Sequence, residues 1–299
     1  MFEVFCGDQS QITNQCLKMR GSSFRFGMSQ GNLQSPEGRR NLFTNLVEKR
    51  PRHIWFAPTC GPWSAWPQFN GQRSIQAWED LLSQRHQQLE QIALGIVLFR
   101  YQRQVDHHFH WEQPARSLMF KMPYLSEVFQ HSQCAEFDMC VVGDLRDPQN
   151  HKPMQKGMIV ATTSLKLFQL LHGRHCPGNH DHQQIEGSTV FEGKSVRRSQ
   201  FSERYPRKFA RQVAEYMCSS QGRHEKPISP WNVAETLVAG SSEAGPLFKK
   251  PWCQCSTRES LSQTEKTREQ TDTTHPERSL ESNLSTGSST NTTGRKENH

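Results

Sequence analysis

Apolar positions along residues 1–218 alternate between short continuous runs and longer segments with helical spacing. The short runs predict buried strands at 2–5, 53–57, 108–112, 137–142 and 158–163. Helical spacing predicts helices around 12–19 and over 35–50, 75–101, 164–173 and 206–218. Strands separated by helices predict an α/β fold, in which a sheet carries helices on both faces.

Three of these elements allow finer predictions. The helix over 35–50 is expected to begin with Ser35 as its N-cap and Pro36 at its first position. Its expected buried stripe consists of Leu42, Phe43, Leu46 and Val47. The helix over 75–101 is expected to bury Leu82, Leu89, Ile92, Ala93, Ile96 and Phe99. In and before the strand over 108–112, we expect half-exposed histidines that are not metal ligands, namely His107, His108 and His110.

The pattern changes after residue 222, and this predicts three parts of the chain. Residues 1–222 form the α/β domain, residues 223–255 are a weakly ordered linker, and residues 256–299 are a Ser/Thr-rich tail. The only aliphatic residues of the tail are Leu261, Leu280 and Leu284. Such a segment cannot bury enough apolar surface to fold, so we expect the tail to be disordered.

Charge and composition narrow the class of partner. The formal net charge of +7 lies entirely in residues 1–222, because acidic and basic residues cancel in 223–299. A basic domain suits nucleic acid, with DNA favoured over RNA, although solubility alone also explains a charge of this size. The sequence has no apolar run that could span a membrane and no secretory signal, so we expect an intracellular protein, nuclear or cytoplasmic and not secreted. Its nine cysteines are then expected to be reduced thiols.

Cys60 lies between Pro58 and Pro62, directly after the apolar run over 53–57. Functional loops of α/β sheets lie at the carboxyl ends of the strands. A thiolate is a good nucleophile, and the two prolines would fix the direction of its sulfur. A buried structural cysteine is the alternative interpretation.

Glu112 ends the next predicted strand, so we expect it beside Cys60 across neighbouring strands. A carboxyl group near an attacking thiolate can protonate the ring that is attacked. The alternative is a carboxylate that stabilises the start of a following helix, by about 0.3–1 kcal/mol.

Three segments resemble motifs of the cytosine-5 DNA methyltransferases. EVFCG (3–7) is similar to the family's first strand and glycine turn, APTCGPWS (57–64) to its Pro-Cys-Gln-x-Phe-Ser loop, and HWEQPARSLMF (110–120) to its Glu-Asn-Val-x-x-Leu strand end. The segment over 138–163 looks like a form seen in divergent, phage-like members. The resemblance implies a Rossmann-like class I methyltransferase sheet and transfer of a methyl group from S-adenosylmethionine to C5 of cytosine in nucleic acid.

The resemblance also implies roles for matching residues. Cys60 would add to C6 of cytosine, Glu112 would hold N3 and the amino group, and Arg146 would stand in for the family's Gln-x-Arg-x-Arg element. The implied cofactor-binding residues are Phe5, Gly7, Asp8, Asn32 and Pro58. No acidic residue lies between Asp8 and Glu37 to hold the ribose, and the target-recognition insert would be confined to about residues 172–200.

Two other functions fit the same residues. One is a non-catalytic nucleic-acid-binding module on a methyltransferase-like scaffold, carried by a mobile element. The other is a cysteine hydrolase, which would use Cys60 with a histidine base that the sequence does not identify.

A second group of residues has zinc-binding chemistry. Cys176, His180 and His182 carry side chains that bind zinc, although their spacing is not that of a standard zinc finger. A four-ligand site needs one more residue, such as Cys140 or Cys134. The alternative is a polar, histidine-rich turn without a metal.

Basic residues surround Phe201 and Tyr205 near the end of the domain. They are Arg197, Arg198, Arg204, Arg207, Lys208 and Arg211. Basic side chains interleaved with aromatic ones suit phosphate contacts and base stacking. A solvated helix face is the alternative.

Overall fold

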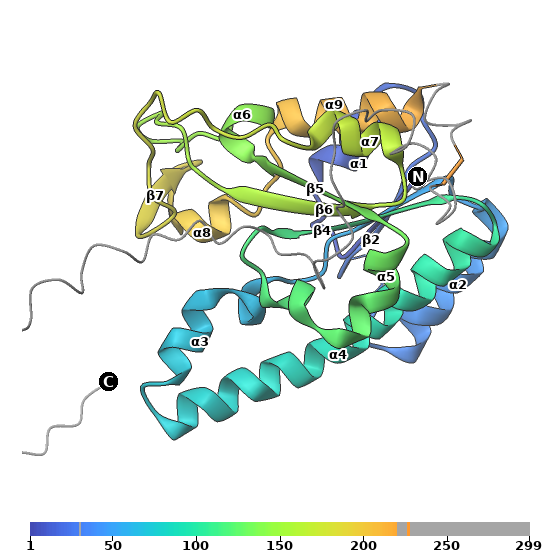
Figure 1. Ribbon diagram of the computed structural model, residues 1–299, viewed down its shortest axis with the longest axis horizontal. Coiled ribbons are helices and arrows are strands. Elements are labelled where there is room, and N and C mark those ends of the chain that lie inside the picture. The colour runs from blue at the N-terminus through green and yellow to red at the C-terminus, as the bar shows by residue number, and fades with distance from the viewer. Residues whose placement is uncertain (30, 220–225, 228–299) are drawn as a thin grey trace, which may run out of the picture. The chain divides into compact units, whose positions relative to one another are not determined.

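The computed structural model describes residues 1–29, 31–219 and 226–227 (Figure 1). They form the mixed α/β fold that the apolar pattern predicts, with a six-stranded sheet and helices on both faces. The predicted linker over 223–255 and the predicted tail over 256–299 lie outside the described residues, apart from 226–227.

The main sheet has the strand order β2-β1-β3-β4-β6-β5. Its strands are β1 (Phe2–Val4), β2 (Phe24–Phe26), β3 (His53–Phe56), β4 (His108–Pro114), β5 (Gln133–Asp138) and β6 (Gly157–Thr162). The first four strands are parallel, and β6 lies antiparallel between β4 and β5. A separate hairpin consists of β7 (Ser188–Phe191) and β8 (Lys194–Arg197).

The strand order reverses at β1. The chain runs from β1 through α1 (Gln11–Lys18) to β2 on one side, and then through α2 (Pro36–Lys49) to β3 on the other. Val4 of β1 is paired with Phe56 of β3, so the loops that follow these strands leave the sheet side by side. Open α/β sheets bind ligands at such a reversal.

Helices cover each face of the sheet with a separate core (Figure 1). One face of the sheet packs against α1, α6 (Met139–Val142), α7 (Leu165–Leu171) and α9 (Arg207–Cys218), and we call it the α1/α9 face. The other face packs against α2, α4 (Ile75–Gln104) and α5 (Ser126–Gln130), and we call it the α2/α4 face. The remaining short helices are η1 (Gly61–Trp63), α3 (Ala65–Gly71), η2 (Leu118–Lys121), η3 (Pro123–Leu125) and α8 (Arg198–Phe201).

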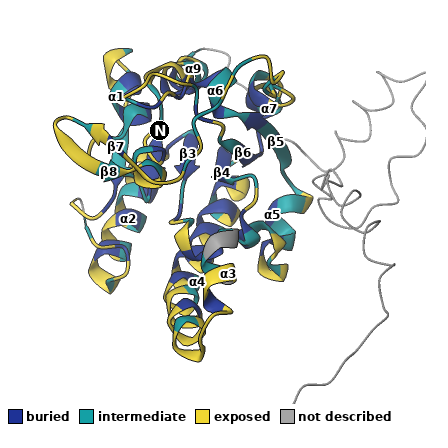
Figure 2. Cartoon of the chain, turned by 90° about the vertical axis from the view of Figure 1, so that its left-hand side faces the viewer, coloured by how far each residue is buried: buried dark blue, intermediate teal, exposed yellow. Residues whose placement is uncertain are grey.

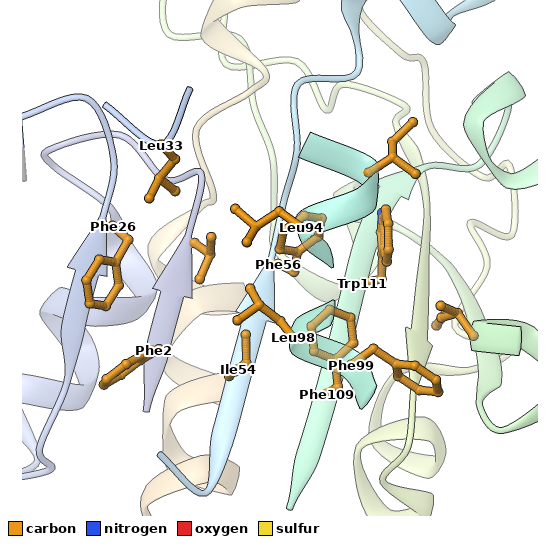
Figure 3. Close-up of a cluster of buried hydrophobic side chains, with 14 of the residues drawn as sticks. Phe2, Phe26, Leu33, Ile54, Phe56, Leu94, Leu98, Phe99, Phe109 and Trp111 are labelled. Carbon is orange, nitrogen blue, oxygen red and sulfur yellow. The ribbon is translucent and has the colours of Figure 1, made fainter. Parts of the chain in front are cut away.

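Alternate residues of the central strands point to opposite faces. Ile54, Phe56 and Trp111 pack with α4 on the α2/α4 face (Figure 3), whereas Trp55 lies in the core of the α1/α9 face. α4 comes close to the sheet at Gly95, where an added Cβ would lie 2.7 Å from the Phe56 ring and 2.8 Å from the Trp111 ring. Figure 2 shows the central strands of the main sheet as buried, and the outer sides of the helices and the β7–β8 hairpin as mostly exposed.

The expectation that the histidines of β4 are half exposed is wrong for two of them. His108 and His110 are fully buried, and their rings stack with His53 of β3 at centroid distances of 5.0 and 5.4 Å. His110 lies 3.1 Å from His53 through Nε2 and Nδ1, and its own Nδ1 lies 2.7 Å from Thr162 Oγ1. Burial, followed by the neighbouring His108, holds the pKa of His110 well below its usual range, so this ring is neutral at pH 7.

The start of α2 confirms the predicted cap, whereas the buried stripes differ. Ser35 accepts a hydrogen bond from Gly38 N at 3.0 Å, and Pro36 is the first residue of the helix. Three residues expected in the stripes of α2 and α4 are exposed, namely Val47, Leu82 and Ala93. The buried side of α4 includes Gln88, Gly95 and Gln102, which an apolar pattern does not mark.

The strand predicted over 137–142 lies four residues earlier than expected, because β5 spans Gln133–Asp138. β5 ends at Asp138, and the next four residues form α6. Met139 and Val142 lie one helical turn apart and both point into the α1/α9 core. Helical spacing therefore buries this apolar pair. Four apolar residues in a row fit a strand and a short helix equally well, so the sequence does not distinguish the two.

Candidate active site

A cavity of about 550 Å³ lies at the carboxyl ends of β1, β3 and β4. Its lining comes from the loops after these strands, from Lys156 just before β6, and from the β7–β8 hairpin and the turn after α8. Of the residues predicted from the sequence, it brings together Phe5, Gly7, Asp8, Pro58, Cys60 and Glu112. Arg146 and Asn32 are not among the residues that line it. A volume of this size suits a small-molecule ligand.

The loop that carries Cys60 is held on both sides of the cysteine. Before it, Gln113 Nε2 of β4 donates a hydrogen bond to Pro58 O at 2.8 Å. After it, Arg85 Nε of α4 donates to Pro62 O at 3.0 Å. The half-buried thiol is therefore presented from a loop that is tied to β4 and α4, in the wall of the cavity.

Burial and three charged side chains determine the pKa of the Cys60 thiol. Burial raises the pKa of its thiol, the Lys156 ammonium opposes this shift, and the carboxylates of Glu112 and Glu203 add to it. The ligand-free protein therefore holds a protonated thiol at neutral pH. A proton on Glu112 removes one of the two repulsive charges and so favours the thiolate.

Glu112 is almost completely buried near the end of β4. Tyr205 donates a hydrogen bond to its Oε2 at 2.8 Å, and Trp55 Nε1 donates to the Tyr205 hydroxyl at 3.0 Å. Burial raises the pKa of Glu112, while the Lys156 charge and the Tyr205 hydroxyl oppose the shift. Glu112 does not cap the next helix along the chain, η2, because Ser117 is the N-cap of that helix. The geometry therefore supports a proton-holding carboxyl group, because a raised pKa suits general acid catalysis.

Lys156 is the cation of this site that the sequence analysis did not identify. Its Nζ donates to the Ser202 carbonyl at 2.7 Å, and it lines the cavity. Arg146, which was expected to supply the charge, instead donates to Asp144 Oδ1 at 2.8 Å and to His151 O at 3.0 Å. Because β6 is antiparallel to β4, the residue before β6 lies beside the carboxyl ends of the parallel strands. A lysine directly before an apolar run can be recognised as a site residue only when the direction of the following strand is known.

The turn after β1 forms another part of the wall. Phe5 has a φ of 61°, and its ring packs edge-on against Phe56 at a centroid distance of 5.3 Å. An added Cβ at Gly7 would meet no atom within 4 Å, so the backbone there borders open space that a ligand can enter. Asp8 accepts a hydrogen bond from Ser29, which follows β2. An acidic group therefore lies near the end of β2, although that strand and the segment after it supply none.

Glu3 is a buried carboxyl group at the same wall, and the sequence analysis assigned it no chemistry of its own. It accepts hydrogen bonds from the Ser10 hydroxyl, from Thr13 N at 3.1 Å and from Thr13 Oγ1 at 2.5 Å. Burial raises the pKa of Glu3, against these hydrogen bonds. Glu3 thereby fixes the start of α1 relative to β1 and holds the intervening glycine turn in place.

The β7–β8 hairpin supplies an aromatic side chain to the cavity, and the turn after α8 supplies a basic one. Phe191 lines the cavity, and the Arg204 guanidinium lies 4.6 Å from the centroid of that ring. Buried Asp147 anchors the hairpin, because it accepts hydrogen bonds from Arg198 Nε at 2.6 Å and from Thr189 Oγ1 at 3.0 Å. The hairpin falls within the range predicted to be the target-recognition insert.

The basic residues over 197–211 divide into two groups. Arg198 is paired with Asp147, and Arg211 is paired with Glu215 one turn further along α9. The exposed members of the other group are Arg197, Arg204, Arg207 and Lys208. These four are the cations of the segment that are accessible to a polyanion.

The predicted metal ligands meet at a second location. Cys176, His180 and His182 are joined by Cys140 of α6, and the four ligand atoms lie within 4.8 Å of one another. Cys134, the other predicted fourth ligand, packs against the core of the α2/α4 face, on the opposite side of the sheet from α6. None of the four clustered residues lines the cavity.

Comparisons with protein-family models, with curated proteins and with solved structures give no match for this chain. Within the described residues, no helix is both long enough and apolar enough to cross a membrane. The function of this protein is therefore inferred from the geometry and chemistry of the cavity.

Proposed function

We propose that this protein transfers a methyl group from S-adenosylmethionine to C5 of cytosine in nucleic acid. The observation that carries the proposal is that Cys60, Glu112 and the Gly7 turn line one cavity where the strand order reverses. These are the three segments that resemble the cytosine-5 methyltransferases. The sheet gives further support, since one antiparallel strand beside the last of several parallel strands is typical of Rossmann-like class I methyltransferases.

The lining of the cavity fits a positively charged cofactor. The carboxyl groups that line it are Glu3, Asp8, Glu112 and Glu203. The cations that line it are Lys156 and Arg204. S-adenosylmethionine carries a sulfonium, an ammonium and a carboxylate group and is therefore a net cation, so this excess of carboxyl groups favours it over an anionic nucleotide polyphosphate. The open backbone at Gly7 and the carboxylate of Asp8 near β2 are the groups that would hold it.

Cys60 and Glu112 supply the two functions that activate cytosine. The Cys60 sulfur, after losing its proton, forms a bond to C6 while Glu112 donates a proton to N3, which makes C5 electron-rich. Bound S-adenosylmethionine would supply the electrophilic methyl group to C5, with cleavage of its sulfur–methyl bond and release of S-adenosylhomocysteine. The C5 proton would then leave to solvent, N3 would return its proton to Glu112, the C5–C6 double bond would re-form, and the sulfur would depart from C6 as a thiolate. Lys156 favours the thiolate at the start and end of this sequence.

The substrate must bring a single base into the cavity. A cytosine inside a duplex cannot be reached by Cys60, so the base has to leave its stack. In this proposal, exposed Arg197 of β8 and exposed Arg204 after α8 would contact phosphates next to the extruded base.

The test is covalent trapping with an oligonucleotide that contains 5-fluorocytosine. The full chain is incubated with excess S-adenosylmethionine, and fluorine at C5 replaces the proton that must leave. We therefore expect a protein–DNA adduct that survives denaturation. Cys60→Ala abolishes this adduct, whereas Cys134→Ala, a change of another half-buried cysteine that does not line the cavity, retains it.

Tight binding of nucleic acid without any adduct would contradict the catalytic role of Cys60. The non-catalytic nucleic-acid-binding module would then be the function, and calorimetry with S-adenosylhomocysteine would show whether the cofactor site is also lost. A cysteine hydrolase is disfavoured, because no histidine is among the described residues that line the cavity.

A further inference from the structure

Four side chains with metal-binding chemistry meet outside the cavity. Cys140 belongs to α6, and the other three belong to the segment between α7 and β7. Cys176 Sγ lies 3.5 Å from His180 Nε2 and 3.4 Å from His182 Nε2. The two Nε2 atoms are 3.0 Å apart. Two segments of the chain therefore direct their ligand atoms at one point.

The sulfur–nitrogen separations of 3.5 and 3.4 Å fit tetrahedral coordination, and the 3.0 Å between the two Nε2 atoms is slightly shorter than in a zinc-bound pair. Bonds of about 2.3 Å to sulfur and about 2.0 Å to nitrogen place the ligand atoms of a zinc site about 3.3–3.8 Å apart. Two cysteines and two histidines also form a ligand set typical of structural zinc. We propose that Cys140, Cys176, His180 and His182 bind one structural zinc ion.

Neighbouring groups orient the ligands. Cys176 N donates to Asp138 Oδ2 at 2.8 Å, and Gly178 N, at a φ of 72°, donates to Cys176 Sγ at 3.4 Å. His180 Nδ1 lies 3.0 Å from Asn179 Oδ1, which leaves Nε2 to face the other ligands. Partners of this kind fix the ring orientation and tautomer of metal ligands. A polar turn without a metal has no need to direct two imidazole nitrogens at one sulfur.

The metal would fix a segment that has no regular structure of its own. Residues 172–187, all of which are described, contain no helix or strand. Gln183 ties the segment to the loop before β6, since its N donates to Pro153 O at 2.8 Å and its Oε1 accepts from Asn150 Nδ2 at 2.7 Å. The segment continues into the β7–β8 hairpin, whose Phe191 lines the cavity. Zinc therefore supports the hairpin, and four protein ligands leave no position for a substrate.

The test is metal analysis of the full chain purified without chelator, followed by replacement of the metal with Co²⁺. We expect about one zinc ion per chain, and a Co²⁺ spectrum of a tetrahedral site with two thiolate ligands. Cys140→Ser and Cys176→Ser should each weaken zinc binding by more than about 100-fold, beyond the loss typical of a residue outside the ligand shell. The matched controls are Cys134→Ser, on the other face of the sheet, and His175→Gln, an exposed histidine next to the cluster.

Unchanged zinc binding by Cys140→Ser and Cys176→Ser would overturn the proposal, whereas loss in these variants and retention in both controls supports it. The wild-type chain gives a second measurement if a variant fails to fold. Removal of the metal with a chelator should lower Tm, and added zinc should restore it. A folded wild-type chain that contains no metal and takes up no Co²⁺ would also overturn the proposal. This readout does not depend on methyl transfer.

Discussion

The two faces of the central strands bury different kinds of side chain. On the α2/α4 face, β3 and β4 present Ile54, Phe56, Phe109 and Trp111. On the α1/α9 face, the same strands present His53, Trp55, His108, His110 and Glu112. Successive residues of one strand therefore contribute to an apolar core on one side and to a group of titratable residues on the other.

The difference shows how each face is stabilised. Apolar side chains need only close packing, which the aromatic rings around α4 supply. A buried polar group needs a partner, and the α1/α9 face provides them from separate elements, as Thr162 does for His110 and Tyr205 for Glu112. We expect changes on the apolar face to affect stability, and changes at Glu112 to affect chemistry.

The largest effect is expected from Glu112→Gln, which removes the proton donor of the polar face. Adduct formation with the 5-fluorocytosine oligonucleotide should slow by about 10²–10⁴-fold, because that is the usual contribution of a positioned acid. Rates come from quenched time courses. Glu203→Gln, a carboxyl change in the same cavity but outside the sheet, should slow the adduct by less than about tenfold. Equal rates for wild type and Glu112→Gln would exclude the acid role.

Next in size is Phe109→Ala, on the apolar face of the same strand. Phe109 is fully buried and contacts the rings of Phe56, Phe99 and Trp111. Its truncation should lower the free energy of unfolding by about 3–5 kcal/mol, measured by urea denaturation. Phe69→Ala, at an exposed phenylalanine, is the control and should change it by less than about 0.5 kcal/mol. Similar losses of unfolding free energy in Phe109→Ala and Phe69→Ala would contradict this prediction, because Phe109 would then contribute no more to packing than an exposed phenylalanine.

A smaller effect is expected from Tyr205→Phe, which leaves Glu112 Oε2 and Trp55 Nε1 without this partner. The free energy of unfolding should fall by about 1–3 kcal/mol, the usual cost of an unsatisfied buried polar group. Tyr124→Phe, at an exposed tyrosine, should leave it unchanged. If Tyr205→Phe is as stable as the wild type, the hydroxyl is not needed to hold Glu112 in place.

The smallest effect concerns pH. Burial raises the pKa of Glu112 above its ordinary value of 4.5. As the pH rises from that value through the raised pKa, the folded protein binds more protons than the unfolded chain, so wild-type stability falls. The loss is complete above the raised pKa and amounts to about 1.4 kcal/mol per unit of pKa. The stability of Glu112→Gln relative to wild type should therefore increase from about pH 4 to pH 8, and a constant difference would refute the raised pKa.

One topological rule was enough to predict from the sequence that three of the motif residues lie close together. Cys60, Glu112 and Gly7 each follow or end an apolar run, and the carboxyl ends of parallel strands meet at one edge of a sheet. Lys156 was missed because β6 runs in the opposite direction, so its amino end reaches that same edge. The burial of His108 and His110 was missed because their partners, His53 and Thr162, come from other strands.

The sequence by itself determined the strands of the main sheet other than β2, the helices α1, α2, α4, α7 and α9, and the order of the motifs. Apolar spacing, proline positions and N-caps suffice for these because they act over a few neighbouring residues. Only the tertiary structure decided the direction of β6, the burial of the polar side chains that β3 and β4 direct to the α1/α9 face, and the pairing of Cys140 rather than Cys134 with the histidine cluster. These features depend on which distant segments pack together. A single strand can carry Cys134 to one face while the helix that follows carries Cys140 to the other, and their sequence separation does not show this.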